Sequence, residues 1–359
     1  MNWNAKRVFV TPAMCALLAV SGCNTVGYYF QAIDGHLEVM RRSTSFEDAI
    51  ADPSAKQSLR VQLDRITRMR DFASRELALP DNGSFRRYAD LGRPYVVWNV
   101  FAAQELSVRG AESCFPFAGC VPYRGFYIEA DARAYARQLA DAGFDTYLGG
   151  VPAYSTLGWF DDPVLSTFVG FVEEEVARIL FHELAHQVAY VRDDTQFNES
   201  FAVAVELEGV RRWLERKGEA QAGEEKQRWL ASQRRRAEFI ALMIHHRSIL
   251  AELYASAASA AKKRDGKLRQ FDNLKLDFEA LKKNWGGFTG YDRYFAQGAN
   301  NALLASIAVY ADYVPAFSAL ITNHRGDMSA FYSEVRRLAQ MEEHARTAYL
   351  QTVVGGSVP

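Results

Sequence analysis

The chain has 359 residues, of which 49% are hydrophobic, so it is long enough for one large domain or two moderate ones. Its 42 basic and 43 acidic side chains give a net charge of −1, with no long run of a single sign. This balance argues against nucleic acid as a partner.

The first residues have the pattern of a secretory signal. Lys6 and Arg7 precede an apolar run over residues 8–20, and two small residues then lead to Cys23. A short basic region, a short apolar stretch and a small-residue cleavage site define such a signal. Because the apolar stretch is too short to favour a membrane span, the sequence predicts an exported protein.

Cys23 makes this segment resemble a bacterial lipoprotein signal. The resemblance implies cleavage before Cys23, which leaves residues 1–22 as the signal peptide, and lipid on Cys23 as a membrane anchor. Asn24 at the next position implies attachment to the outer membrane, facing the periplasm. An ordinary signal peptide with a coincidental cysteine is the alternative.

Two cysteines remain once the signal and the lipid attachment site are set aside. Cys114 and Cys120 form an even pair in an oxidising compartment, and Pro116 and Gly119 between them can turn the chain. We therefore expect a local disulfide. Two free buried thiols are the alternative, and a cysteine-based zinc site lacks a second pair at suitable spacing.

Hydrophobic periodicity predicts one domain over residues 23–359, of fold class mainly α with a small β-sheet (α+β). Its regions in chain order are N-terminal helices (23–90), a β-sheet with the main motif helices (91–217), a long helical hairpin (218–285) and C-terminal helices (286–350).

β-branched and aromatic residues predict strands at 95–103, 125–129 and from 144, with a helix over 131–140. In the hairpin, we expect an interruption near residues 262–266, where charged residues lead to a glycine.

Two further features belong to the same half of the chain. The arginine run 234–236 is interpreted as a solvated face of the hairpin. A single last helix is predicted over residues 328–349.

The strongest motif lies between Phe168 and Tyr190, where apolar residues at three- and four-residue steps predict a mostly apolar helix. Within it, His182, Glu183 and His186 form an H-E-x-x-H motif. Residues i and i+4 share one helix face, so the two imidazoles can bind one metal ion. Glu183 lies one position round, where it can take a proton from a metal-activated water. This pattern predicts a zinc hydrolase.

Two glutamates are candidates for the third ligand. Residues 198–202 (N-E-S-F-A) resemble the N-E-G-F-A helix start that carries the ligand glutamate in gluzincin aminopeptidases, which implies Glu199. Twelve residues separate Glu199 from His186, fewer than is usual in that clan. Glu206, twenty residues after His186, is the reserve candidate. The two glutamates share a helix face, so one can bind the metal and the other can support a ligand.

Segments spread over nearly the whole mature chain resemble the bacterial family of zinc aminopeptidases that are predicted lipoproteins. The resemblance is carried by G-Y-Y-F-Q-A (27–32) with G-H-L (35–37), Y-S-T-L-G-W-F-D-D-P (154–163), the His182 motif and residues 198–202. It implies a gluzincin-like peptidase that holds one Zn²⁺ ion and removes N-terminal residues from peptides.

The same clan implies a donor for the developing oxyanion, usually a tyrosine or histidine well downstream of the glutamate ligand. By position Tyr291, Tyr294 and Tyr310 all qualify, and the sequence does not choose among them. Each is also suited to packing.

Four residues are candidates for contacts with substrate. The aromatic, glycine-punctuated residues 151–163 are interpreted as an edge strand that binds a peptide backbone, with Tyr154 and Ser155 nearest the site. Glu175, two turns before His182, is a candidate for holding an α-amine, and Asn300 for a substrate terminus. An ordinary loop, an acidic first helix turn and a helix cap are the respective alternatives.

The sequence thus predicts a zinc-dependent peptidase, of which aminopeptidase is the implied type and peptides the implied substrates. Two alternatives remain at this point: a zinc endopeptidase, and an envelope-anchored binding protein whose zinc site is structural. Glu183 favours an enzyme, because a structural site has no use for a base beside an open coordination position.

Overall fold

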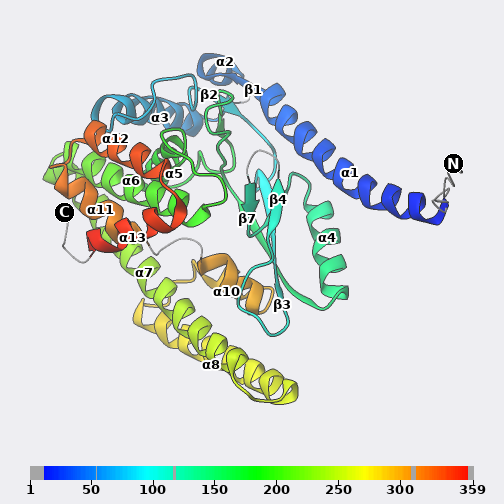
Figure 1. The fold of residues 1–359 in the computed structure, drawn as a ribbon. Helices are drawn as coiled ribbons and strands as arrows, with labels where there is room; N and C mark the ends of the chain where they lie inside the picture. Colours follow the sequence, from blue (N-terminus) through cyan, green and yellow to red (C-terminus); the bar gives the residue numbers. More distant parts are fainter. Residues whose placement is uncertain (1–11, 54, 116–118, 309–312, 355–359) are drawn as a thin grey trace, which may run out of the picture.

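The computed structural model describes residues 12–53, 55–115, 119–308 and 313–354, and this part of the chain is mainly helical with small sheets (Figure 1). The fold-class prediction is confirmed to that extent. Its helices are α1 (Pro12–Arg42), α2 (Phe46–Ala51), α3 (Gln57–Glu76), α4 (Glu129–Asp141), α5 (Glu173–Ala185), α6 (Thr195–Arg216), α7 (Glu219–Ala255), α8 (Ala260–Asn284), α9 (Asp292–Phe295), α10 (Asn301–Ala308), α11 (Val314–Asn323), α12 (Met328–Ala339) and α13 (Glu343–Val354). Among the residues described, no helix is both long and apolar enough to cross a membrane.

The strands are short and form separate small sheets. They are β1 (Ser43–Ser45), β2 (Arg87–Ala89), β3 (Val97–Gln104), β4 (Ser113–Phe115), β5 (Gly119–Val121), β6 (Arg124–Phe126), β7 (Phe144–Val151) and β8 (Val164–Leu165). The sheets have the orders β1-β2-β8, β6-β3-β7 and β4-β5, and only the β2–β8 pair is parallel among these strands.

The β6-β3-β7 sheet is covered on both faces. Successive side chains of a strand point to opposite faces, so β3 divides its residues between two clusters. Trp98 and Val100 pack with Ala132 of α4, whereas Phe101 and Ala103 pack in the cluster that contains α10. This explains why the middle of β3 is an unbroken apolar run.

The largest core places α5 and α6 side by side, and α3 packs against both. The ring of Phe72 lies 5.9 Å from that of Phe181 and 5.1 Å from that of Trp213, centroid to centroid. A Cβ on Gly209 would lie 2.6 Å from the Phe181 ring, so this glycine lets the two helices approach closely. The helices that carry the motif residues are therefore rigidly paired.

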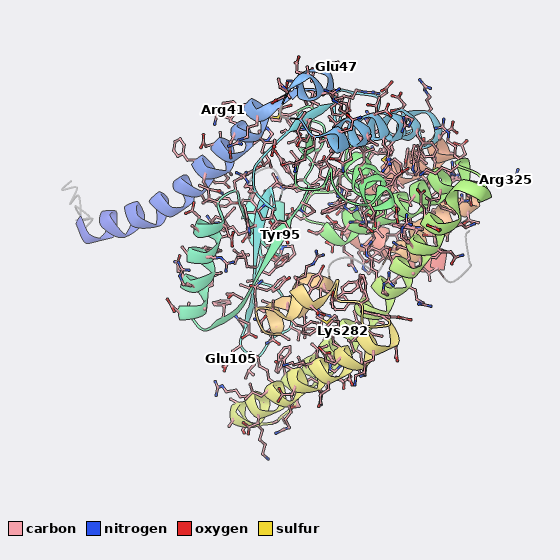
Figure 2. All side chains as sticks on the ribbon, turned by 180° about the vertical axis from the view of Figure 1, so that it is seen from behind. Arg41, Glu47, Tyr95, Glu105, Lys282 and Arg325 are labelled. Carbon is pink, nitrogen blue, oxygen red and sulfur yellow. A yellow bond between two sulfur atoms is a disulfide. The ribbon has the colours of Figure 1, made fainter. Side chains whose placement is uncertain are left out.

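The hairpin α7–α8 extends from the body as an arm (Figure 1). Ion pairs attach it to the sheet: Arg264 Nε lies 2.7 Å from Glu105 Oε1, and Lys267 Nζ lies 2.7 Å from Asp145 Oδ2. Figure 2 labels Glu105 at this junction. The arm shares an apolar cluster with α10 and the outer face of β3.

The predicted strands are confirmed in β3, β6 and β7, and the helix after β6 in α4. The predicted interruption of the hairpin at 262–266 is wrong, because the chain turns at Ser256–Ser259 and Ser259 caps α8. Gly266 lies inside α8, where an added Cβ would lie 2.6 Å from Leu253, so it serves close packing and not a turn. The single last helix is also wrong: α12 and α13 are separate.

Candidate metal centre

Two histidines and a glutamate from neighbouring helices meet at the C-terminal end of α5. His182 lies in the last turn of α5 and His186 caps it, with their Nε2 atoms 3.2 Å apart. Glu199, near the start of α6, places Oε2 3.4 Å from His182 Nε2 and Oε1 3.7 Å from His186 Nε2. The structure thus brings together the three residues expected to bind a metal.

The three side chains fit a zinc ion. Zinc binds imidazole nitrogen and carboxylate oxygen at about 2.0–2.2 Å in tetrahedral geometry, which places neighbouring ligand atoms about 3.3 Å apart. The observed separations of 3.2, 3.4 and 3.7 Å are close to that length. Two imidazoles and one carboxylate are also the donors of catalytic zinc sites that leave a fourth position open. These residues could therefore hold Zn²⁺ with room for one further ligand.

Glu206 lies on the other side of His182 and not among these ligand atoms. Its side chain is fully buried, and Oε2 lies 2.9 Å from His182 Nδ1. A histidine that binds a metal through Nε2 commonly donates from Nδ1 to a carboxylate, which fixes the ring. The geometry therefore separates the two candidate glutamates: Glu199 faces the candidate metal position and Glu206 supports His182.

Two arginines compensate the charge of Glu206. Arg178 Nη1, from α5, lies 3.1 Å from Oε2, and Arg236 Nη1, from α7, lies 2.7 Å from Oε1. Arg236 belongs to the run interpreted as a solvated face, so that interpretation is wrong for this residue. Arg234 in the same run is exposed. The arm is thus tied to the carboxylate that orients His182.

The link between α5 and α6 determines where Glu199 lies. Asn198 bonds the backbone of Val191 twice, accepting from its N–H and donating to its carbonyl, each at 2.7 Å. Asp194 caps α6 by accepting from the N–H of Phe197 at 2.9 Å, and Arg346 of α13 donates to Asp194 at 3.0 Å. These contacts hold a short, ordered turn, which is why Glu199 reaches the histidines despite the short spacing.

Burial and neighbouring charges shift the pKa values of the cluster in opposite directions. Burial lowers the pKa of His182, but hydrogen bonds to Glu199 and Glu206 outweigh it and raise that pKa to about 10. Burial dominates at His186 and lowers its pKa to about 4. Burial would raise the pKa of Glu199, yet its hydrogen bond with His182 holds that pKa below the usual range. In the metal-free protein, His182 and Glu199 form the charged pair.

Glu183 has the environment of a general base. Burial raises its pKa to about 7, opposed by the charge of His182 and assisted by the charges of Glu199 and Asp162. Asp162 is itself buried, and burial raises its pKa to about 6. Two carboxyl groups with elevated pKa values therefore influence each other beside the histidines.

Residues 152–163 form turns, so the predicted edge strand there is wrong. The hydroxyl of Tyr154 lies 2.8 Å from Nδ1 of His36 on α1, and Ser155 Oγ accepts from the N–H of Leu157 at 3.1 Å. A Cβ on Gly158 would lie 3.6 Å from the side chain of Gln187, which follows His186. We call residues 152–163 the cleft loop: it lies along the end of α5, with Tyr154 held by α1.

The candidate oxyanion tyrosines are placed differently. Tyr291 stacks on Phe239 with ring centroids 4.4 Å apart, and Tyr294 lies 5.2 Å from the same ring, both within the apolar cluster of the arm. Tyr310 lies outside the described residues. Burial raises the pKa of Tyr291, and the charges of Arg236 and Glu175 also act on it, so this tyrosine lies near the ionic network around Glu206. A role of Tyr291 or Tyr294 at the oxyanion stays a prediction.

Tyr123 is a further candidate that the sequence did not single out. It lies in the turn between β5 and β6, and its ring packs against the apolar cluster of the arm, 5.5 Å from Phe101 between centroids. Burial raises the pKa of its hydroxyl, and the charges of Glu199 and Glu183 raise it further. Tyr123 precedes the motif in the chain, and nothing in its local sequence distinguishes it from a packing tyrosine.

The other two candidates have structural partners. Glu175 accepts a hydrogen bond from Arg178 Nε at 2.8 Å and so belongs to the ionic network around Glu206. Asn300 donates to the carbonyl of Thr146 at 2.8 Å and accepts from the N–H of Leu303, which caps α10. Contacts of either residue with substrate stay predictions.

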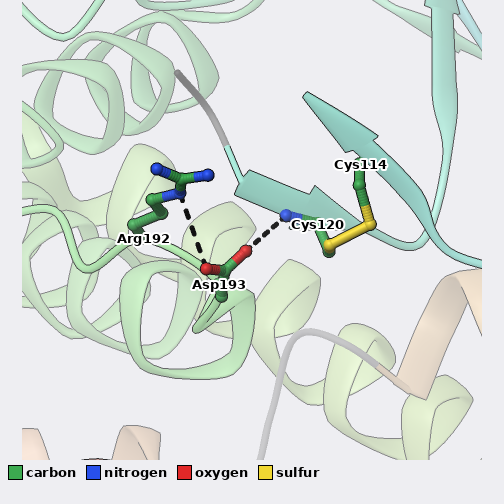
Figure 3. The surroundings of a disulfide bond; sticks show 4 residues. All are labelled: Cys114, Cys120, Arg192 and Asp193. Atoms are coloured by element: carbon green, nitrogen blue, oxygen red, sulfur yellow. Dashed lines mark hydrogen bonds and ion pairs between the residues drawn. A yellow bond between two sulfur atoms is a disulfide. The ribbon is translucent and has the colours of Figure 1, made fainter. Parts of the chain in front are cut away.

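A disulfide joins Cys114 and Cys120 and closes the hairpin β4–β5 (Figure 3). The N–H of Cys120 donates to Asp193 Oδ1 at 2.6 Å, within the α5–α6 link. A Cβ on Gly119 would lie 2.3 Å from the same oxygen, so only glycine permits this close approach. The hairpin is therefore seated on the link that follows His186, and it leads directly to Tyr123.

The fold and the cluster together define a mainly helical α+β protein with a two-histidine, one-glutamate site. The chain belongs to the family described as "Putative aminopeptidase", whose model matches residues 27–350. The aminopeptidase family expected from the resemblance is thereby confirmed, and it indicates a peptidase, whereas zinc, the gluzincin type and the lipid anchor stay predictions. Comparison with curated proteins gave no match, and comparison with solved structures gave none either.

Proposed function

We propose that this protein is a zinc-dependent aminopeptidase of gluzincin type. The observation that carries the proposal is the convergence of His182, His186 and Glu199 at tetrahedral separations, with the half-buried Glu183 next to His182 in the chain. A bound zinc ion would supply Lewis acidity and lower the pKa of a water molecule at the site. The family assignment supports a peptide as the substrate.

Glu183 and Tyr123 have complementary roles in this proposal. Glu183 takes a proton from the attacking water and passes it to the leaving amine, and a pKa near neutrality suits both transfers. The Tyr123 hydroxyl, neutral because its pKa is raised, donates a hydrogen bond to the oxyanion that forms at the scissile carbonyl. Tyr123 is preferred to Tyr291 and Tyr294 in this role, because the charges of Glu199 and Glu183 act on its hydroxyl.

An aminopeptidase must also bind a free α-ammonium group, and we assign this to Asp162 of the cleft loop. Its Oδ2 accepts from the N–H of Thr156 at 2.8 Å, whereas its Oδ1 has no hydrogen-bond partner among the described residues. A buried carboxylate oxygen without a partner gains strongly from a cation. The charge of Asp162 already acts on Glu183, which supports a location within reach of the substrate N-terminus.

The export signal supports a location in the cell envelope. In this proposal, lipid on Cys23 anchors the mature chain to the outer membrane, and the substrates are peptides in the periplasm. Cys23→Ser should release the protein from the membrane fraction, and mass spectrometry of the N-terminal peptide should find the lipid only in the parent chain.

The deciding experiment measures zinc content and hydrolysis for a panel of free-amine and N-blocked peptides. Glu183→Gln should retain zinc and lose more than about a hundredfold in kcat. Glu279→Gln, an exposed glutamate on α8, is the matched control and should behave as the parent. Cleavage of blocked peptides would make the protein an endopeptidase. Zinc without turnover on either set would make it a binding protein with a structural site.

A further inference from the structure

A stripe of exposed apolar side chains runs along the outer face of α1. Phe30, Ile33 and Leu37 are 69%, 57% and 44% exposed. Their spacing of three and four residues places them on one face of the helix. Such a stripe would normally be buried, so it calls for a partner.

The opposite face of α1 packs on the protein. Val39 is fully buried, and a Cβ on Gly35 would lie 2.2 Å from the Tyr127 ring, so the helix is pressed against its neighbours there. The exposed stripe is thus held in a fixed orientation by the buried side of the same helix.

The cleft loop adds an aromatic side chain next to α1. The Phe160 ring, 51% exposed, lies 4.6 Å from the ring of His36 on α1, between centroids, and Trp159, which precedes it in the chain, is 79% exposed. We call Phe30, Ile33, Leu37, Trp159 and Phe160 the α1 patch. It combines a helical stripe with an exposed tryptophan, a combination typical of side chains that enter a membrane interface.

The position of the patch along the chain indicates what covers it. Phe30, its first residue, follows Cys23, the residue proposed to carry lipid, by seven positions, so an anchored chain holds the patch close to the bilayer. Beside the stripe, Arg41 pairs with Asp34 at 3.3 Å, so these two charges offset each other. Figure 2 labels Arg41 at the inner end of α1.

We propose that the α1 patch rests on the surface of a phospholipid bilayer. This goes beyond the proposed lipid anchor, because the contact is made by side chains and fixes an orientation. Since His36 and Phe160 join α1 to the cleft loop, the loop would lie at the membrane surface. Because the patch consists of apolar side chains, zwitterionic lipid suffices and the interaction is insensitive to salt.

The test measures binding of the mature chain (residues 23–359) with Cys23→Ser, which removes the lipid, to phosphatidylcholine vesicles by co-sedimentation. The parent should bind, and Phe30→Ser/Ile33→Ser/Leu37→Ser should bind at least about tenfold more weakly. Leu268→Ser/Leu276→Ser is the matched control, because these α8 leucines are 66% and 68% exposed. It should bind as the parent does.

Three outcomes would overturn the proposal: no binding by the parent, equal binding by the triple variant, or a dimer in light scattering that the triple variant abolishes. The last result would make the patch a contact between copies of the chain. Thermal unfolding of all variants checks the fold. Hydrolysis of soluble peptides reports on the proposed function separately, since that activity does not require the vesicles.

Discussion

His182 Nδ1 donates a hydrogen bond to Glu206 Oε2 across 2.9 Å. The direction follows from chemistry, because an ionised carboxylate only accepts and the two arginines on Glu206 hold its pKa far below the usual range despite burial. With the proton on Nδ1, Nε2 of a neutral His182 has its lone pair directed at Glu199 and His186. The second carboxylate thus selects the tautomer that a metal ligand requires.

Arg236→Gln should weaken the hold of Glu206 on His182, although Arg236 itself does not contact the histidine. Glu206 stays buried with Arg178 as its remaining arginine, so we expect a loss of roughly 2–3 kcal/mol in the free energy of unfolding. We also expect zinc affinity to fall by about 10–100-fold. Urea titration and competition with a chelating dye measure the two effects. Arg234→Gln, on the exposed side of the same helix, is the control. If Arg236→Gln and Arg234→Gln have the same free energy of unfolding and the same zinc affinity, the arm does not support the site.

Zinc binding should release a proton from His182. In the metal-free protein its pKa of about 10 keeps both ring nitrogens protonated at pH 8, and a metal at Nε2 removes one of these protons. Above pH 8, Glu183, with its pKa of about 7, has already ionised. Zinc affinity should therefore rise about tenfold per pH unit between pH 8 and 9. Calorimetry in buffers of different ionisation enthalpy should find about one proton released.

The same pKa shift makes the stability of the metal-free protein depend on pH. A raised pKa in the folded state means that the folded chain binds the proton more tightly than the unfolded chain. The contribution of His182 is fully present below about pH 6.5 and is lost as the pH rises through about 10. The difference in unfolding temperature between the parent and His182→Gln measures this contribution as a function of pH. If that difference does not become smaller toward high pH, the pKa of His182 is not raised in the folded protein.

Asp162→Asn should weaken hydrolysis of free-amine substrates. Asparagine can still accept from the N–H of Thr156, so the loop is preserved while the charge is lost. We expect kcat/KM for free-amine substrates to fall by about a hundredfold, with zinc content and thermal unfolding unchanged. Asp161→Asn is the neighbouring exposed control. A loss of zinc or a lower unfolding temperature in Asp162→Asn would assign Asp162 to structure alone.

Tyr123→Phe should lower kcat by about 10²–10³-fold with little change in KM, because the oxyanion forms only as the reaction proceeds. Tyr291→Phe and Tyr294→Phe are the comparison variants, because all three rings pack against the same apolar cluster. Stopped assays at saturating substrate measure kcat for all three. If Tyr294→Phe shows the large loss and Tyr123→Phe does not, the assignment of the oxyanion donor reverses.

How much of this site could be predicted depends on how local each signal is. His182 and His186 were predictable because one helix turn brings them together. Glu199 was implied by the N-E-S-F-A resemblance. The role of Glu206 stayed open, since both glutamates lie on one face of α6 and only the packing of α5 and α7 brings Arg178 and Arg236 onto Glu206. Tyr123 lies between β5 and β6, and Arg236 lies in α7. Local periodicity in the sequence does not show that either element packs near the histidines. The glycine at position 266 likewise reads as a turn until its partner Leu253 is known.

Two segments that are distant in the sequence stabilise the link after His186. The N–H of Cys120, in the β4–β5 hairpin, donates a hydrogen bond to Asp193, and Arg346 of α13 donates one to Asp194. A chain still being synthesised lacks the second contact until α13 has been made, so the turn that carries Glu199 to the histidines is not yet held. The candidate metal site therefore becomes complete only after α13 has packed on the link.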